Sequence, residues 1–209
     1  MISKICDKIM VSVRAKMPEV DDERAEVIKF GFELLIGEVP KIFVMIIVGW
    51  LLGILKYSIL SIVIILPYRF FSGGLHLKSH IGCIIGTTLF YCGIAYFGKI
   101  INLPSIKVKL VISILILIFA CIMITLYAPA DTENIPILRK KERKSKKICS
   151  YIVVIIMTII SFVIKNHIIS NMIIIAILLQ SIMISKFAYD IFKVKLGYLE
   201  SIKIKKNAI

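Results

Sequence analysis

Acidic residues, histidine and paired cysteines are all scarce in this chain of 209 residues. Asp and Glu number 13 against 27 Lys and Arg, which gives a formal net charge of +14. The five cysteines are scattered and form no Cys-x-x-Cys pair, so a disulfide framework is not expected. No glycine-rich nucleotide-binding loop is present, which argues against an ATP-driven pump. The first apolar residues alternate with lysine and arginine, so a cleavable signal peptide is not expected either.

Long isoleucine-rich runs dominate what the chain does contain. Hydrophobic residues make up 59% of the sequence, which is typical of a polypeptide whose solvent is lipid. We therefore expect an integral membrane protein. The basic residues lie between and beside the apolar runs, so they indicate membrane topology and contacts with anionic membrane lipids rather than a nucleic-acid partner.

The amino-terminal region, residues 1–38, has the pattern of amphipathic helices. Residues 1–17 place apolar side chains at helical spacing, with charged ones on the other side. Such a helix lies at the membrane interface or packs on its own protein, and the pattern fits both equally. Pro18 ends it, and an acidic stretch then starts a second helix that is expected to run to about Leu35.

Six apolar runs follow, and we expect them to form a transmembrane core over residues 39–188. Several are short, because a straight span needs about 20 residues. The runs lie near residues 40–55, 57–71, 81–98, 108–127, 150–165 and 168–187. The expected fold is therefore all-α: a single polytopic membrane domain, residues 1–209, with about six transmembrane helices behind the amphipathic ones.

Two strongly basic segments fix the expected orientation, namely a loop at residues 128–149 and a tail at residues 189–209. The positive-inside rule places both in the cytoplasm. Four spans before the loop then put the amino terminus and the connection at residues 69–80 on the same side. We therefore expect a multi-pass protein of the cell membrane with both termini and the candidate site toward the cytoplasm.

The stretch FFSGGLHLKSHIGCIIG holds two of the three histidines and one cysteine at the edge of an apolar segment. A cysteine is nucleophilic as a thiolate, which requires a neighbouring base or a positive potential. On one continuous helix His76 and Cys83 would stand about 10 Å apart in rise. We expect instead that Gly73 and Gly74 bend the chain and return His76 toward a helix capped by Ser79. Cys83 would then lie near the positive end of that helix.

Other readings of these residues stay open on spacing alone. His80 is a rival base, because it lies one turn before Cys83. A cysteine in a membrane helix is more often an apolar filler, and a histidine at its edge an interfacial polar residue. Two histidines and one cysteine are too few for a zinc site, so we expect neither a metal nor a cofactor.

Two blocks of this sequence, YRFFSGGLHLKSHIGC and YAPADTENIPI, resemble the signature of the accessory gene regulator protein B (AgrB) family. Its members are membrane proteases that mature the autoinducing peptides of Gram-positive quorum sensing. The resemblance implies that His76 and Cys83 are the catalytic pair, which favours His76 over His80. Arg69, Gly73 and Gly74 match the family's pattern upstream of the pair and are expected to support it.

The second block adds two carboxylates, Asp131 and Glu133. They are candidates for substrate recognition or for orienting His76, and otherwise belong to a solvated loop bounded by prolines. The basic run at residues 139–147 serves topology, or it also attracts an acidic substrate tail.

The activity that the resemblance implies is that of a cysteine endopeptidase. It would cut an AgrD-like propeptide and pass the acyl group to an internal Cys or Ser, which closes a thiolactone or lactone ring. The resemblance also implies a homodimer. The rival from another class is a transporter or export component that cuts no bond.

Overall fold

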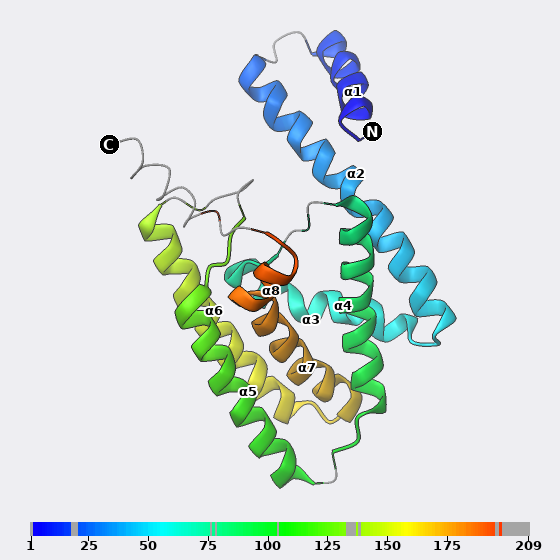
Figure 1. The fold of residues 1–209 in the computed structure, drawn as a ribbon. Helices are drawn as coiled ribbons and strands as arrows, with labels where there is room; N and C mark the ends of the chain where they lie inside the picture. The colour runs from blue at the N-terminus through cyan, green and yellow to red at the C-terminus, as the bar shows by residue number, and fades with distance from the viewer. Residues whose placement is uncertain are drawn as a thin grey trace.

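The computed structural model describes residues 2–17, 21–75, 77, 79–103, 105–132, 137, 139–194 and 197, and the elements in this part are α-helices (Figure 1). Within these residues no strand forms, and one isolated bridge pairs Gly73 with Ala130. The prediction of an all-α fold is therefore confirmed.

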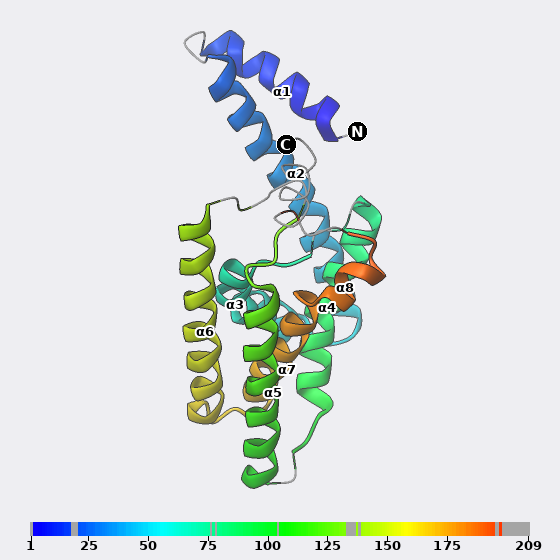
Figure 2. The ribbon, with the colours of Figure 1, turned by 60° about the vertical axis from the view of Figure 1, so that its left-hand side comes forward.

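The first two helices, α1 (Ile2–Lys16) and α2 (Asp22–Leu51), form a hairpin. α1 and the first part of α2 project from the remaining helices, whereas the later part of α2 packs against α4 (Figures 1 and 2). The sequence predicted one helix ending near Leu35 and a separate span from residue 40, but the structure has a single helix across both. Pro40 removes one backbone donor, yet the residues on both sides favour helix and the helix continues through it.

Contacts between α1 and α2 hold the hairpin closed. Arg14 pairs with Asp22 at 2.7 Å, and Lys29 pairs with Asp7 at 2.6 Å. The apolar side chains of Cys6, Met10 and Ala25 are buried in this hairpin. α1 therefore packs on its own chain.

The remaining helices form a bundle around α7. They are α3 (Leu55–Ser72), α4 (His80–Ile100), α5 (Ile106–Tyr127), α6 (Lys140–Val163), α7 (His167–Met183) and α8 (Lys186–Ile191). α7 contacts α3, α4, α5, α6 and α8, which makes it the central element of the core. Met172 and Ile177 of this helix are almost fully buried against the surrounding helices.

Four of the described helices are long and apolar enough to cross a membrane: α3, α4 from Ile81, α5 and α6. The expected count of about six spans is not reached by this measure. α7 has 17 residues, which is short for a span, and α2 carries its apolar residues mainly in its second half. The four apolar helices fit a membrane protein.

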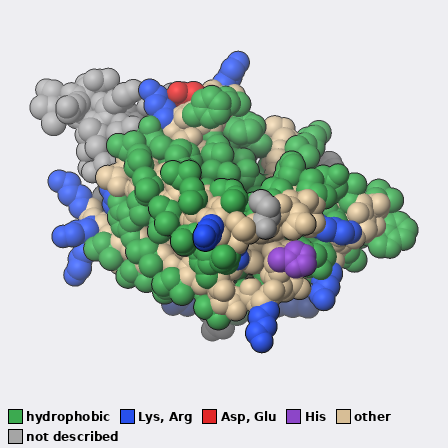
Figure 3. Space-filling model, turned by 90° about the horizontal axis from the view of Figure 1, so that it is seen from below, with side chains coloured by type: hydrophobic (Ala, Val, Ile, Leu, Met, Phe, Trp, Pro, Cys, Tyr) green, Lys and Arg blue, Asp and Glu red, His purple; other side chains and the backbone are tan. Residues whose placement is uncertain are grey.

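Large apolar side chains cover the outward faces of these helices. Val63, Leu115 and Ile159 are each more than half exposed. Seen from the end opposite the hairpin, hydrophobic side chains dominate the surface and Lys and Arg stand mainly at its margin (Figure 3). An exposed apolar surface of this extent is suited to lipid.

The basic run expected within the loop at residues 128–149 is largely helical. α6 begins at Lys140, so the first turns of this helix hold most of the run. Lys and Glu favour helix, and Lys146 pairs with Glu142 one turn away at 3.1 Å. Lys147 donates to the carbonyl of Thr125 at 2.6 Å, which satisfies a group near the end of α5.

Candidate active site

The chain turns sharply at Gly73, where α3 ends. Gly73 has φ of +74° and ψ of −157°, a backbone conformation that is essentially restricted to glycine. A Cβ atom at this position would lie 2.1 Å from the carbonyl oxygen of Ala130. The expected bend is therefore present, and both the conformation and the close approach require glycine.

This turn joins the two sequence blocks in space. The N–H of Ala130 donates to the carbonyl of Ser72 at 2.8 Å, and the N–H of Gly74 donates to the carbonyl of Ala130 at 3.0 Å. The side-chain amide of Gln180, from α7, donates to the carbonyl of Gly73 at 2.7 Å and to the hydroxyl of Ser72 at 3.0 Å. The segment that leads to His76 is thus held from two sides.

Asp131 belongs to the support of this turn rather than to the wall of the pocket described below. Its carboxylate accepts hydrogen bonds from the N–H of Ile137 and from the guanidinium of Arg143, each at 2.9 Å. The side chain of Asp131 is 1% exposed. Arg143 also donates to the carbonyl of Pro129 at 3.1 Å, so the second block is anchored to the start of α6. Glu133 lies outside the described residues.

The start of α4 places the cysteine as the spacing predicted. Ser79 is the N-cap, and its hydroxyl accepts from the N–H of Gly82 at 3.4 Å. The N–H of Cys83 donates to the carbonyl of Ser79 at 2.8 Å, so Cys83 closes the first turn. The thiol therefore lies near the partial positive charge of the helix N-terminus.

Glycines on α4 let the preceding loop fold back over this turn. The side chain of Leu77 lies 3.3 Å from the position of a Cβ at Gly86 and 3.7 Å from that at Gly82. Leu77 therefore packs beside Cys83. His76, the residue before it, lies outside the described residues. His80 is the first residue of α4, and its side chain is likewise outside the described part.

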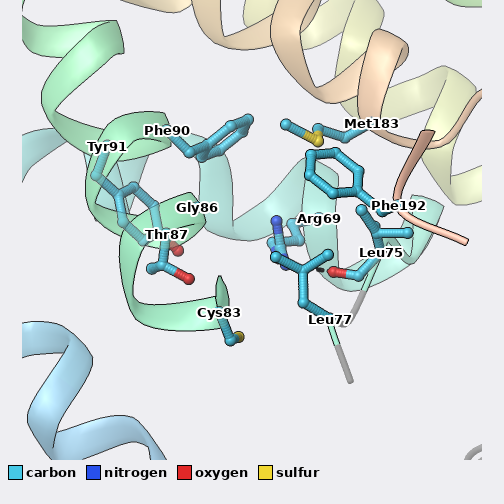
Figure 4. Close-up of a pocket in the computed structure, with 10 residues that line it drawn as sticks. All are labelled: Arg69, Leu75, Leu77, Cys83, Gly86, Thr87, Phe90, Tyr91, Met183 and Phe192. Atoms are coloured by element: carbon cyan, nitrogen blue, oxygen red, sulfur yellow. Dashed lines mark hydrogen bonds between the residues drawn. The ribbon is translucent and has the colours of Figure 1, made fainter. Parts of the chain in front are cut away.

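Cys83 lies at the wall of a pocket that encloses about 450 Å³, including space open to solvent (Figure 4). The pocket is lined by Arg69, Leu75, Leu77, Cys83, Gly86, Thr87, Phe90, Tyr91, Met183 and Phe192. The guanidinium of Arg69 stands 5.8 Å from the centre of the Phe90 ring and donates to the carbonyl of Leu75 at 3.4 Å. The site thus combines a thiol, a fixed cation and apolar walls.

Lys41 is a buried charged residue that the sequence pattern did not single out. It lies on α2, outside the four candidate spans, is 9% exposed, and donates to the carboxylate of Glu38 at 2.5 Å. Burial by itself lowers the pKa of Lys41, but the hydrogen bond to Glu38 and the nearby Cys83 outweigh it and raise that pKa. The sequence feature that could have drawn attention to Lys41 is the presence of a lysine at the start of an apolar run.

Among the described residues, no group of three His, Cys, Asp or Glu side chains is placed to share a metal ion. Of the sequence-predicted site residues, the structure brings Arg69 and Cys83 to one pocket. Gly73 and Gly74 shape the turn that leads to it, and Ser79 caps the helix that bears the thiol.

Comparison with known proteins gives a family. Residues 3–184 match the family described as Accessory gene regulator B. The chain belongs to this family. The resemblance carried by the two sequence blocks is therefore confirmed, and it extends over nearly the whole chain. No solved structure matches the chain at a significant level.

Two curated relatives illustrate the similarity to AgrB proteins. A putative AgrB-like protein of Clostridium perfringens (strain SM101 / Type A) is 28% identical over 149 residues, which cover 70% of this chain and 69% of the relative. An accessory gene regulator protein B of Staphylococcus aureus (strain bovine RF122 / ET3-1) is 27% identical over 135 residues, which cover 64% of this chain and 70% of the relative.

Proposed function

We propose that this AgrB family member is a membrane cysteine endopeptidase that matures an AgrD-like quorum-sensing propeptide. Family membership supports a role in processing such a peptide. The single observation that carries the enzymatic part is the placement of Cys83 in the first turn of α4, at the wall of an apolar pocket that also holds Arg69.

Cys83 is the nucleophile of the proposed reaction, and His76 is its base. His76 follows Leu75 and precedes Leu77 in the chain, and both leucines line the pocket that contains Cys83. The imidazole takes the proton of the thiol, and the thiolate attacks the carbonyl carbon of the scissile peptide bond. The carbon–nitrogen bond breaks, the proton passes to the leaving amine, and the amino-terminal part of the propeptide stays on Cys83 as a thioester.

Ring closure follows from the same thioester. An internal Cys or Ser of the propeptide gives its proton to His76 and attacks the thioester carbonyl. The bond to Cys83 breaks, and the released thiolate takes that proton back. The product is a thiolactone or a lactone, and no net oxidation occurs. Water competes with the internal nucleophile, so apolar walls such as Phe90 and Met183 favour closure over hydrolysis.

The substrate is held at the same membrane surface by an amphipathic leader of its own. Confining enzyme and propeptide to one bilayer raises their effective concentration. The basic first turns of α6 offer a surface for the acidic tail of such a propeptide, because opposite charges attract at this range.

The proposal is tested by co-expressing each variant with a propeptide and detecting the released tail by mass spectrometry. Cys83→Ala and His76→Ala should each abolish cleavage while the protein still reaches the membrane fraction. Cys121→Ala removes another half-buried thiol, on α5, and should cleave normally. Normal cleavage by Cys83→Ala would refute the protease assignment, and loss of cleavage with His80→Ala but not His76→Ala would move the base to His80.

The rival assignment, a peptide exporter without proteolysis, predicts a different product. An intact propeptide would then appear outside the cell, and Cys83→Ala would export it as well as the wild type does. Finding the cleaved ring only with the wild-type thiol excludes that rival.

A further inference from the structure

A buried glutamine holds the turn from which one wall of the pocket begins. Gln180 lies on α7 and is fully buried. Its side-chain amide donates to the carbonyl of Gly73 at 2.7 Å and to the hydroxyl of Ser72 at 3.0 Å. A carbonyl oxygen can only accept a hydrogen bond, so the nitrogen of this amide must face Gly73. The central helix of the bundle is therefore bonded directly to the backbone that follows α3.

Burial leaves part of this amide unpaired. The side-chain oxygen of Gln180 is buried and accepts no hydrogen bond from the residues that the structure describes. An unpaired buried acceptor destabilises a fold, and a methionine of similar volume would avoid that penalty in an apolar core. The contacts that the amide provides in return are the two hydrogen bonds that it donates to the turn.

The turn connects this amide to the pocket. A Cβ at Gly74 would lie 3.5 Å from Nε2 of Gln180 and 3.8 Å from Cζ of Arg69, so both side chains lie against Gly74. The carbonyl of the next residue, Leu75, accepts from the guanidinium of Arg69 at 3.4 Å (Figure 4). Leu75 and Arg69 both line the pocket that contains Cys83. A continuous path of contacts therefore runs from α7 through the turn to the pocket wall.

We propose that Gln180 is a positioning residue of the candidate active site. Its amide fixes the turn after α3 and thereby holds Leu75 and Arg69 in the wall of the pocket. Small displacements of groups that line a site slow a reaction strongly, because the reacting atoms need close and aligned contact. His76 follows Leu75 in the chain, so the same turn also leads to the proposed base. The inference rests on the proposed function for its meaning, but the placement of the wall is measured without any substrate.

The access of an alkylating reagent to this wall tests the placement directly. Leu75 is 8% exposed, so the thiol of Leu75→Cys should react slowly with iodoacetamide in the detergent-solubilised protein. Lys78 separates this position from Cys83, so trypsin places the two thiols on different peptides for mass spectrometry. Addition of Gln180→Met removes both donated hydrogen bonds at nearly constant volume. It should raise the alkylation rate at position 75 on the order of tenfold, because the turn opens more often.

Asn171→Leu is the matched control. Asn171 also lies on α7, is 5% exposed, and donates from its side-chain amide to a remote carbonyl, that of Ile101, at 2.7 Å. This contact is near the start of α7, whereas Gln180 is near its end. Both substitutions should lower the thermal unfolding midpoint, but Asn171→Leu should leave the rate at position 75 unchanged. An unchanged rate in Gln180→Met overturns the proposal, and so does an equal rise in both variants.

Gln180→Glu separates the hydrogen bond from the volume of the side chain. A protonated carboxyl donates a hydrogen bond to the carbonyl of Gly73, and an ionised one does not. The charged groups that flank the turn, Arg69 and Asp131, are common to this variant and the wild type. The rate at position 75 relative to that with Gln180 should therefore fall toward one as the pH is lowered. A ratio that does not depend on pH overturns the proposal, and this ratio decides if Gln180→Met does not fold.

The outcomes also separate this proposal from the proposed function. Gln180→Met should slow propeptide cleavage on the order of tenfold, while Asn171→Leu should change it little. Faster alkylation at position 75 in Gln180→Met, together with normal cleavage by Cys83→Ala, would retain the positioning role and remove the protease assignment. Loss of cleavage in Cys83→Ala with unchanged alkylation at position 75 in Gln180→Met would do the reverse.

Discussion

Two adjacent glycines in the site have different structural roles. Gly73 combines a positive φ with a carbonyl oxygen 2.1 Å from the place of a Cβ, whereas a Cβ at Gly74 would meet its nearest atom, Nε2 of Gln180, at 3.5 Å. A side chain at Gly73 would force the Ala130 backbone to move, whereas a Cβ at Gly74 would make an ordinary van der Waals contact.

We therefore expect Gly73→Ala to be far more damaging than Gly74→Ala. Its backbone strain alone costs on the order of 1–3 kcal/mol, and displacement of Ala130 adds to it. Gly73→Ala should lower the thermal unfolding midpoint in detergent and abolish propeptide cleavage, while Gly74→Ala should change both only slightly. Equal effects of the two substitutions would show that the turn is not the reason for the glycine.

At the residue scale, the sequence predicted what depends on neighbours in the chain. The turn at Gly73, the cap at Ser79 and the place of Cys83 in the first turn follow from local chain chemistry. Gln180 was missed because its partner is remote: it bonds a carbonyl 107 residues away. Lys41 was missed because its burial depends on how the helices pack. A polar residue inside an apolar run indicates that its side chain needs a hydrogen-bond partner, but the run itself does not identify that partner.

Three helices in this bundle, α4, α5 and α8, begin with a serine cap, and of these only α4 bears Cys83. Ser79 accepts from the N–H three residues on at 3.4 Å, and Ser105 does so at the start of α5 at 3.3 Å. Removal of either hydroxyl should cost about 0.5–2 kcal/mol of stability.

Substitution of the two caps separates an effect on the first turn of α4 from a loss of stability of the whole fold. Ser79→Ala and Ser105→Ala should lower the thermal unfolding midpoint to a similar extent. Only Ser79→Ala should also slow alkylation of Cys83 and propeptide cleavage, because fraying of the first turn of α4 displaces the thiol from the helix terminus. A parallel loss of cleavage in Ser105→Ala would mean that general destabilisation explains both.

At the element scale, helix positions were predicted better than helix limits. The sequence predicted a break between about Leu35 and residue 40 and a loop through the basic run at residues 139–147. The structure instead continues one helix past Pro40 and begins another within the basic run. A proline removes one donor without ending a helix whose other hydrogen bonds persist, and lysines form helix well when a Glu lies one turn away. Charge and proline patterns alone do not show which of these small free-energy contributions is larger.

At the scale of the whole molecule, the packing of the helices explains why the sequence predicted about six spans while four described helices are long and apolar enough to cross a membrane. Most residues of α7 are apolar and other helices surround it, so hydropathy alone does not distinguish it from a lipid-facing span. Its 17 residues rise about 26 Å, somewhat less than a hydrocarbon core of about 30 Å. α6 has 24 residues and rises about 36 Å, which is enough to cross.

These lengths give a labelling prediction for three exposed lysines at helix ends: Lys144 in the first turns of α6, Lys165 between α6 and α7, and Lys186 at the start of α8. Each is replaced in turn by cysteine and treated with a membrane-impermeant maleimide, and the labelled peptide is identified by mass spectrometry.

In intact cells we expect Lys165→Cys to be labelled and Lys144→Cys to be protected until lysis, because α6 separates them and the basic side remains in the cytoplasm. Lys186→Cys should also be protected, because α7 lies among helices that cross and a small tilt or local thinning of the bilayer accommodates its length. Labelling of Lys186→Cys from outside would make α7 re-entrant and favour fewer spans. Equal labelling of Lys144→Cys and Lys165→Cys would remove α6 from the membrane and overturn the cytoplasmic placement of the active site with it.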